Sequence, residues 1–77
     1  MEKTLKEFVP GEKGKVIKID ADCKIRRRLF DMGVTPGTLI LMKKIAPFGD
    51  PIEVMLRGYE LSLRKEEANK ILMEIEK

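Results

Sequence analysis

Proline and glycine interrupt this chain at short intervals along its whole length. Its 77 residues include 6 glycines and 4 prolines, and pairs such as Pro10-Gly11 and Pro36-Gly37 separate short apolar segments. Segments of this length are typical of strands joined by turns. The spacing therefore favours a small sheet that curls or closes on itself, within one domain that covers residues 1–77.

Five segments between these turns have the composition or the alternation of β-strands. Residues 14–19 are rich in β-branched side chains, and residues 39–45 are strongly apolar. In the later segments apolar and polar residues alternate, which is typical of a strand with one buried face. The five expected strands are residues 14–19, 39–45, 52–57, 61–64 and 71–76.

One segment has the spacing of a helix and lies between the first two expected strands. Ile25, Leu29 and Met32 recur at i, i+4 and i+7 and form one apolar stripe. Asp22 is suited to cap the start of this helix, and Gly33 to the left-handed conformation that ends one. Single helical turns are expected over residues 5–9 and 65–70.

Together these elements predict a mainly β fold. We expect a small SH3-like barrel of about five strands, with the helix inserted between strands 1 and 2. The last strand should pair near the first, because an unpaired sheet edge invites aggregation.

The residue types that most enzymes and metal sites use are scarce. The chain has no histidine and no tryptophan, and Cys23 is its single cysteine. Histidine is the commonest general base and the commonest metal ligand, and one cysteine can form neither an internal disulfide nor a thiolate zinc site. We therefore expect a binding or accessory protein that is not an enzyme and has no cofactor. The lone thiol fits a reducing, cytoplasmic compartment.

Positive charge is concentrated in one part of the chain. Residues 13–28 hold seven basic residues against two acidic ones, although the net charge of the whole chain is only +3. Successive residues of a helix fan out by 100°, so the three arginines of residues 26–28 cannot share a face. Arg27 and Arg28 are candidates for contact with an acidic partner, phosphate or anionic lipid headgroups, and the alternative is a solvated surface with internal charge pairs.

A second candidate surface is apolar and combines three of the expected strands. If Leu39 and Leu41 face the core, their neighbours on the same strand point outward, and the alternation of the later strands adds further outward residues. An exposed patch of this kind is typical of protein-binding surfaces. The expected members are Ile40, Met42, Phe48, Met55 and Leu72. The alternative is that the helix or the N-terminal turn covers them.

Several motifs, in register over nearly the whole chain, resemble the FeoA family of ferrous iron transport proteins. Residues 27–38 (RRLFDMGVTPGT) are similar to its "RRL-x-x-[LM]-G-[LV]-x-P-G" signature. Residues 10–16 match the family's opening segment, residues 46–52 its "AP-x-GDP" loop, and residues 57–68 its closing "RGY-x-L-x-LR-x-x-EA" segment.

The resemblance implies an SH3-like barrel and a cytosolic accessory role beside FeoB, a membrane ferrous-iron transporter with a cytoplasmic G domain. It supplies no catalytic or metal-binding residue. The signature residues are mostly turn formers and barrel closers: Gly33, Pro36, Gly37, Gly58 and Arg64. The expected partner is therefore the cytoplasmic region of a FeoB-type transporter, whose assembly or activity this chain would modulate.

Two alternatives of other classes stay open. The first is a nucleic-acid-binding barrel, because the spacing of Gly11, Gly14 and Val16, with nearby lysines, faintly resembles the KOW motif of such proteins. The small number of aromatic residues and the mild net charge count against it, and no nucleic acid is expected as a partner. The carboxylates of Asp20, Asp22 and Asp31, near Cys23, are the ligands from which a divalent-metal-responsive domain would be built. Self-association is a further open possibility.

Overall fold

The computed structural model describes residues 1–76 and consists mainly of antiparallel strands. Within these residues the elements are β1 (Glu2–Thr4), the 3-10 turn η1 (Leu5–Glu7), β2 (Lys13–Ile19), α1 (Cys23–Asp31), β3 (Leu39–Ile45), β4 (Ile52–Leu56), β5 (Tyr59–Leu63), α2 (Lys65–Ala68) and β6 (Ile71–Glu76).

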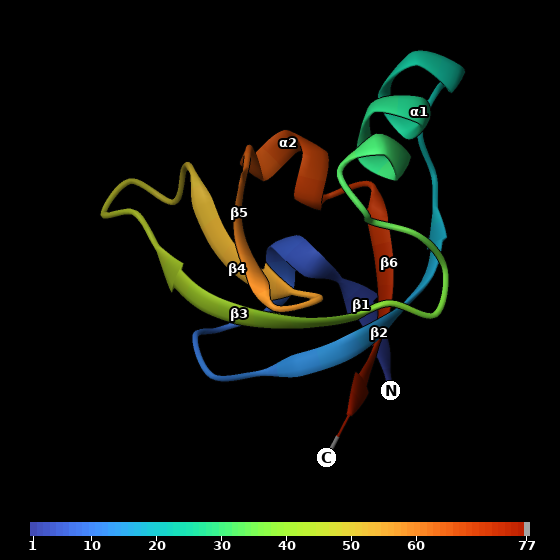
Figure 1. Ribbon diagram of the computed structural model, residues 1–77. Helices are drawn as coiled ribbons and strands as arrows, with labels where there is room; N and C mark the ends of the chain where they lie inside the picture. Colours follow the sequence, from blue (N-terminus) through green and yellow to red (C-terminus); the bar gives the residue numbers. More distant parts are fainter. Residues whose placement is uncertain (77) are drawn as a thin grey trace.

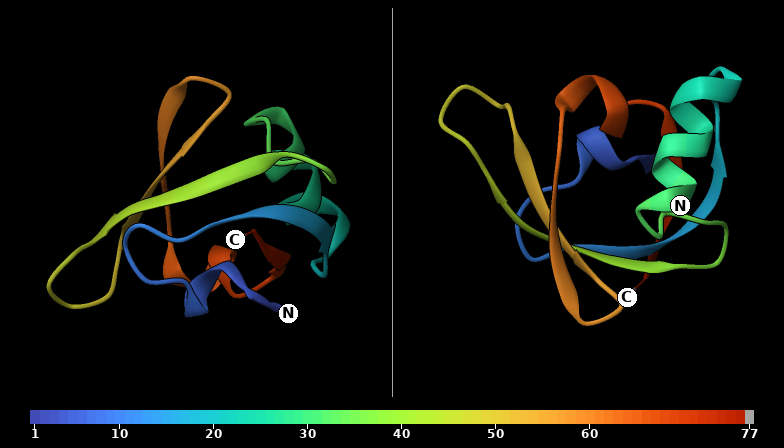
Figure 2. Two further views of the ribbon diagram at one scale, coloured as in Figure 1. Left: turned by 90° about the horizontal axis from the view of Figure 1, so that it is seen from below. Right: turned by 45° about the horizontal axis from the view of Figure 1, so that its top comes forward.

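The strands form one sheet in the order β1-β6-β2-β3-β4-β5, which curls around the core (Figure 1). Both α1 and α2 lie at the upper end of the curl, and the right-hand view of Figure 2 brings this end forward. The register shifts in β2 between Val16 and Lys18, and in β3 between Met42 and Lys44. Such bulges increase local twist, which helps a short sheet to close on itself.

The interior is filled by aliphatic side chains from every strand except β1, together with residues of α1, α2, η1 and the loops. The buried apolar residues are Leu5, Phe8, Val16, Ile19, Leu29, Val34, Ile40, Met42, Ile52, Val54, Leu56, Leu63, Ala68, Ile71 and Met73. A single continuous cluster of this kind is what holds so small a domain together.

Most of the expected elements are confirmed. The five expected strands correspond to β2, β3, β4, β5 and β6, and β6 pairs with β2 as expected. The helix is also where its pattern placed it: the Ile25 N–H donates to Asp22 Oδ1 at 2.9 Å, and Gly33 has a φ of +93°. The single helical turns appear as η1 and α2.

Within residues 1–76 the structure has six strands rather than five, because β1 was not expected. Its three residues, Glu2–Thr4, show no apolar alternation, and they pair with β6 in the register Glu2↔Glu74 and Thr4↔Leu72. Pairing with the edge of β6 therefore determines this strand, and no local pattern in the sequence predicts it.

The expected outward positions of Ile40 and Met42 are wrong. Ile40 is 0% exposed and Met42 is 1% exposed, whereas Leu39 on the same strand is 45% exposed. Residues 39–42 are all apolar, so alternation cannot tell which face is inside. The pairing Met42↔Val54 decides the question, because it places Met42 beside a buried side chain of β4.

Candidate partner-binding surfaces

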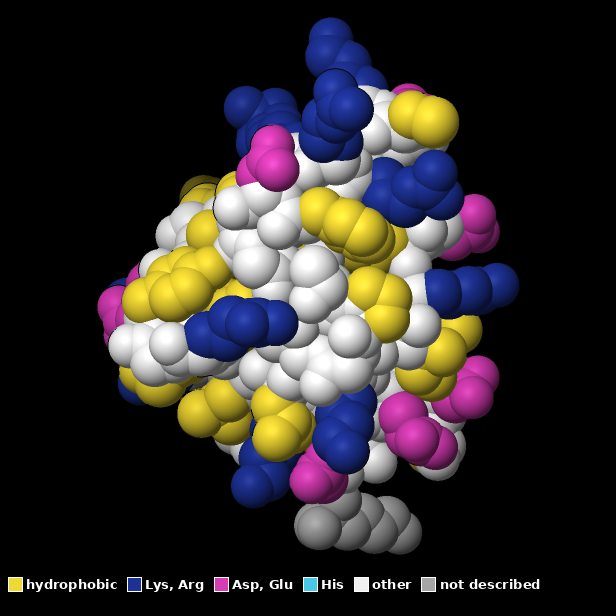
Figure 3. Space-filling view, turned by 45° about the vertical axis from the view of Figure 1, so that its right-hand side comes forward, with side chains coloured by type: hydrophobic (Ala, Val, Ile, Leu, Met, Phe, Trp, Pro, Cys, Tyr) yellow, Lys and Arg dark blue, Asp and Glu magenta, His cyan; other side chains and the backbone are white. Residues whose placement is uncertain are grey.

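Helix α1 presents a basic face to solvent because its opposite side is apolar. Leu29 is fully buried, and Ile25 and Met32 pack against the same core cluster. Three basic side chains elsewhere on the helix are exposed: Lys24, Arg26 and Arg27. In Figure 3 dark blue side chains gather at the top of the molecule, around this helix.

Arg28 is also exposed, but its guanidinium is engaged within the molecule. Arg28 Nη2 lies 3.1 Å from Glu67 Oε2, and the Glu67 residue is only 6% exposed. Glu67 Oε1 accepts a hydrogen bond from the Arg64 N–H at 3.0 Å. The ion pair therefore ties α1 to α2, and a contact of Arg28 with a partner stays a prediction.

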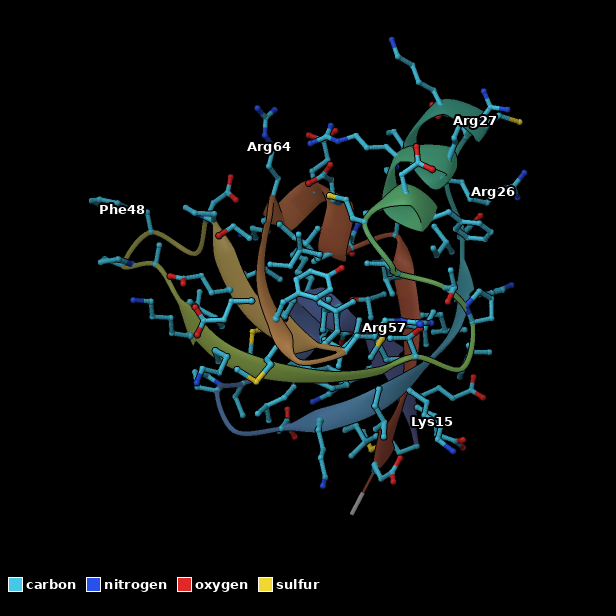
Figure 4. All side chains as sticks on the ribbon, viewed as in Figure 1. Lys15, Arg26, Arg27, Phe48, Arg57 and Arg64 are labelled. Atoms are coloured by element: carbon cyan, nitrogen blue, oxygen red, sulfur yellow. The ribbon has the colours of Figure 1, made fainter. Side chains whose placement is uncertain are left out.

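The basic face of α1 contains a shallow hollow. It is lined by Cys23, Arg26, Arg27, Phe30 and Asp31. Arg26 Nη2 lies 3.9 Å from Cys23 Sγ, and Phe30, which also lines the hollow, is 44% exposed. Arg26 and Arg27 point away from the body of the protein in Figure 4. The arrangement offers two guanidinium groups and one aromatic ring to a ligand.

The β3–β4 loop carries the most exposed aromatic side chain of the described residues. Phe48 is 96% exposed. The loop beneath it is held in place: the Ala46 N–H donates to the Pro51 carbonyl at 3.1 Å, and the Lys65 N–H donates to Asp50 Oδ1 at 2.9 Å. Phe48 and Arg27 lie on opposite sides of the molecule in Figure 4, so the structure does not bring these two candidates together.

The outer face of the sheet carries a different apolar group from the one expected. Leu41 stands opposite Met55, and both are half-buried, while Leu39 is exposed beside them. Met55 thus faces outward as expected, with Leu39 and Leu41 in place of Ile40 and Met42. This face continues onto the exposed Lys13 and Lys15 of β2, which stand opposite Leu41 and Leu39.

Leu72 is half-buried on β6 and does not join this group. It stands opposite Thr4 on one side and Lys18 on the other. Strand β2 therefore separates Leu72 from the apolar residues of β3 and β4. The expected single patch is replaced by separate positions, and the roles of Phe48, Met55 and Leu72 in binding stay predictions.

Sequence reasoning gave no role to Arg57 and Tyr59, two residues that connect distant parts of the fold. Arg57 Nη2 donates to Thr35 Oγ1 and Thr38 Oγ1, each at 3.3 Å, and the Tyr59 hydroxyl donates to the Met32 carbonyl. These bonds join the β4–β5 turn to the segment that follows α1. The Arg57-Gly58-Tyr59 motif was the sequence signal that could have identified these two residues. Their hydrogen bonds stabilise the fold.

The acidic side chains are dispersed rather than clustered. Within residues 1–76 no three His, Cys, Asp or Glu side chains are grouped as metal ligands.

Glu12 is held in place by two hydrogen bonds: its carboxylate accepts the Val9 N–H at 2.9 Å and the Lys3 ammonium at 3.0 Å. The hydrogen bond from the Val9 N–H, and next the one from Lys3, lower the pKa of Glu12 below its ordinary value.

Among the described residues, no helix is both long and apolar enough to cross a bilayer.

Comparison with known proteins identifies related chains. Residues 3–75 match the model of the FeoA domain family. A Porphyromonas gingivalis protein, a fusion of Fe(2+) transport protein A with the Fe(2+) transporter FeoB, is 31% identical over 71 residues. The match covers 92% of this chain but only 8% of that much longer protein.

Solved structures have the same fold. A FeoA-like protein from Clostridium acetobutylicum superposes with a TM-score of 0.89 at 49% identity, over 96% of this chain and 86% of that one. FeoA from Stenotrophomonas maltophilia, solved with zinc and described as a prokaryotic SH3-domain protein, superposes with a TM-score of 0.79 at 27% identity, over 92% and 88% of the two chains. The expected SH3-like barrel is thereby confirmed.

Proposed function

The chain belongs to the FeoA domain family, and we propose that it is an accessory protein of ferrous iron transport that binds the cytoplasmic region of a FeoB-type transporter and modulates its assembly or activity. One observation carries this proposal: in the Porphyromonas gingivalis relative, an equivalent domain and the transporter are parts of one polypeptide. Domains that are fused in one protein are held at high effective concentration, which favours a direct contact between them.

The surface of the chain supports a role in binding. Phe48 and Phe30 expose aromatic rings, and Arg26 and Arg27 extend from α1. Aromatic and arginine side chains contribute most of the energy of many protein interfaces. The Stenotrophomonas maltophilia FeoA has been suggested to act as an activating factor for ferrous iron transport, and a binding surface of this kind suits such a non-catalytic role.

We place the protein in the cytoplasm, where the proposed region of the transporter lies. The free, exposed thiol of Cys23 suits a reducing compartment. A homo-oligomeric state stays a prediction, which size-exclusion chromatography with light scattering would test.

The test of the proposal is a direct binding measurement. The purified chain would be titrated into the purified cytoplasmic region of a FeoB-type transporter from the same organism and followed by isothermal titration calorimetry. Saturable heat with a defined stoichiometry is the expected result. A binding curve indistinguishable from buffer, with both proteins folded by circular dichroism, would refute the proposed contact.

A further inference from the structure

We propose that the outer face of α1 is a docking site for an acidic peptide segment that carries an apolar side chain. The face is formed by Lys24, Arg26, Arg27 and Phe30 around the hollow described above. The inference rests on the proposed function only for the identity of the protein that would contribute this segment, namely the transporter.

The first argument is charge. Helix α1 carries four basic residues and one acidic residue, and Arg28 is neutralised by Glu67. The carboxylate just before the helix, Asp22, is engaged as the N-cap. None of Lys24, Arg26 and Arg27 forms an ion pair with a carboxylate within residues 1–76. The face therefore carries a net positive charge, with Asp31 as the one carboxylate that lines the hollow, and its complement is an acidic ligand.

The second argument is the type and order of the side chains. A guanidinium group presents donors in a planar fork that binds a carboxylate with two hydrogen bonds. The lining residues belong to one helix, so Phe30 and Asp31 lie about one turn further along α1 than Arg26 and Arg27. Asp31 repels acidic groups from that turn, so the carboxylates of the peptide belong near the arginines and its apolar side chain over Phe30.

A peptide fits this face better than a membrane surface does. A helix that lies on a bilayer inserts a broad apolar stripe, but the stripe of α1 is turned into the core at Leu29. Phe30 alone is left on the outside. Phe48 does not extend the apolar part of this face, because it lies on the other side of the molecule from Arg26 and Arg27 (Figure 4).

The test uses a fluorescein-labelled synthetic peptide in which glutamates flank one leucine, and the same peptide with glutamine in place of glutamate as its control. Fluorescence anisotropy would be measured with the full-length protein and with the double variant R26E/R27E. We expect the variant to bind the acidic peptide at least about tenfold more weakly, because hydrogen bonds to charged groups are among the stronger ones. The glutamine peptide should not bind.

The matched control is the double variant K13E/K15E. It changes the net charge by the same amount as R26E/R27E, but at two residues of β2. Lys15 lies at the lower end of the molecule in Figure 4, away from α1. Binding by this control should stay within about twofold of the original value, since exposed and distant charges are screened by salt. An equal loss in both double variants would mean a general charge effect and would overturn the proposed site.

A conservative variant and vesicles complete the design. R26K/R27K keeps both positive charges but removes the planar guanidinium groups, so we expect a loss of peptide affinity smaller than that of R26E/R27E. Unchanged affinity would overturn the role given to the guanidinium groups. Vesicles rich in phosphatidylglycerol should not compete with the peptide; competition by vesicles stronger than that by unlabelled peptide would overturn the choice of a peptide ligand. Circular dichroism of each variant would show that it is folded.

The same variants separate this inference from the proposed function. If the original protein binds the transporter's cytoplasmic region and R26E/R27E binds it equally well, the docking site is refuted and the proposed function stands. If the original protein binds the acidic peptide but not that region, the proposed function is refuted and the docking site stands.

Discussion

At the scale of single residues, Gly33 shows how one position can fix the end of α1. Its φ of +93° is a conformation that other residues rarely adopt, and a Cβ atom there would lie 2.7 Å from the Tyr59 hydroxyl oxygen. That hydroxyl is the far end of an exposed side chain and donates to the Met32 carbonyl, so moving it away disturbs this hydrogen bond. The position therefore disfavours a side chain for two reasons, its positive φ and this close contact.

We expect Gly33→Ala to lower the free energy of unfolding by about 2–4 kcal/mol, from backbone strain and overpacking together. Gly37→Ala is the matched control. Gly37 has a similar φ of +90° but has nothing within 4 Å of an added Cβ, so only about 1 kcal/mol should be lost. Urea unfolding followed by circular dichroism would measure both. Equal losses would mean that the contact with Tyr59 contributes nothing.

Glu12 makes stability depend on pH. Its pKa is lowered below the ordinary value of a glutamate, by the Val9 N–H and then by Lys3, so folding favours the ionised carboxylate. The resulting stabilisation is present above the pKa of the unfolded chain and is lost as the pH falls through the folded pKa. Urea midpoints measured downward from neutral pH should therefore fall less for Glu12→Gln than for the original protein. Glu66→Gln removes the same charge at an exposed residue without ion pairs within residues 1–76, and an equal effect of both variants would mean that the Val9 and Lys3 contacts of Glu12 contribute nothing.

At the scale of elements, one ion pair connects α1 to α2. Glu67 is buried and accepts the Arg64 N–H, while Arg28 reaches its second oxygen from the neighbouring helix. Removing Arg28 would leave a buried carboxylate without its counter-charge. The loss is limited because the Arg28 side chain is 59% exposed and solvent already screens the pair.

We expect Arg28→Ala to destabilise the fold by about 1 kcal/mol, below the 3–5 kcal/mol typical of a fully buried pair. Arg27→Ala on the same helix is the control and should change stability by less than about 0.5 kcal/mol, because Arg27 is exposed and makes no ion pair within the described residues. Thermal unfolding of the two variants checks this. If both lose the same amount, the Arg28–Glu67 pair has no role in stability.

The elements also show what the sequence could predict. The boundaries of α1 follow from local chemistry, since Asp22 caps its start and Gly33 ends it. Alternation placed β4 and β6 correctly because one face of each is mostly polar. It failed on β3, where residues 39–42 are all apolar and only the pairing with β4 decides which face is buried. Strand β1 depends wholly on the edge of β6, which lies about 70 residues away in the chain.

At the scale of the whole molecule, the candidate residues fall on different sides. An interface of ordinary size covers about 800 Å² of one partner, about a sixth of this protein's accessible surface of 4978 Å². Figure 4 shows the Phe48 loop and α1 on opposite sides of the molecule, so a partner that contacts both has to extend across it. Sequence reasoning identified Arg27 and Phe48, but their separation follows from the curl of the sheet.

The Phe48 loop therefore gives a test of how a partner approaches. Phe48 is 96% exposed, so Phe48→Ser should change the free energy of unfolding by less than about 0.5 kcal/mol. The acidic peptide proposed for α1 should bind this variant as before, because its site is distant. Binding to the cytoplasmic region of the transporter should weaken by about tenfold, since an exposed aromatic ring is a preferred anchor and a folded partner can extend around the molecule. Calorimetry with the original protein and Phe48→Ser measures this. Equal affinities would remove Phe48 from the binding surface and leave α1 as the face that meets the partner.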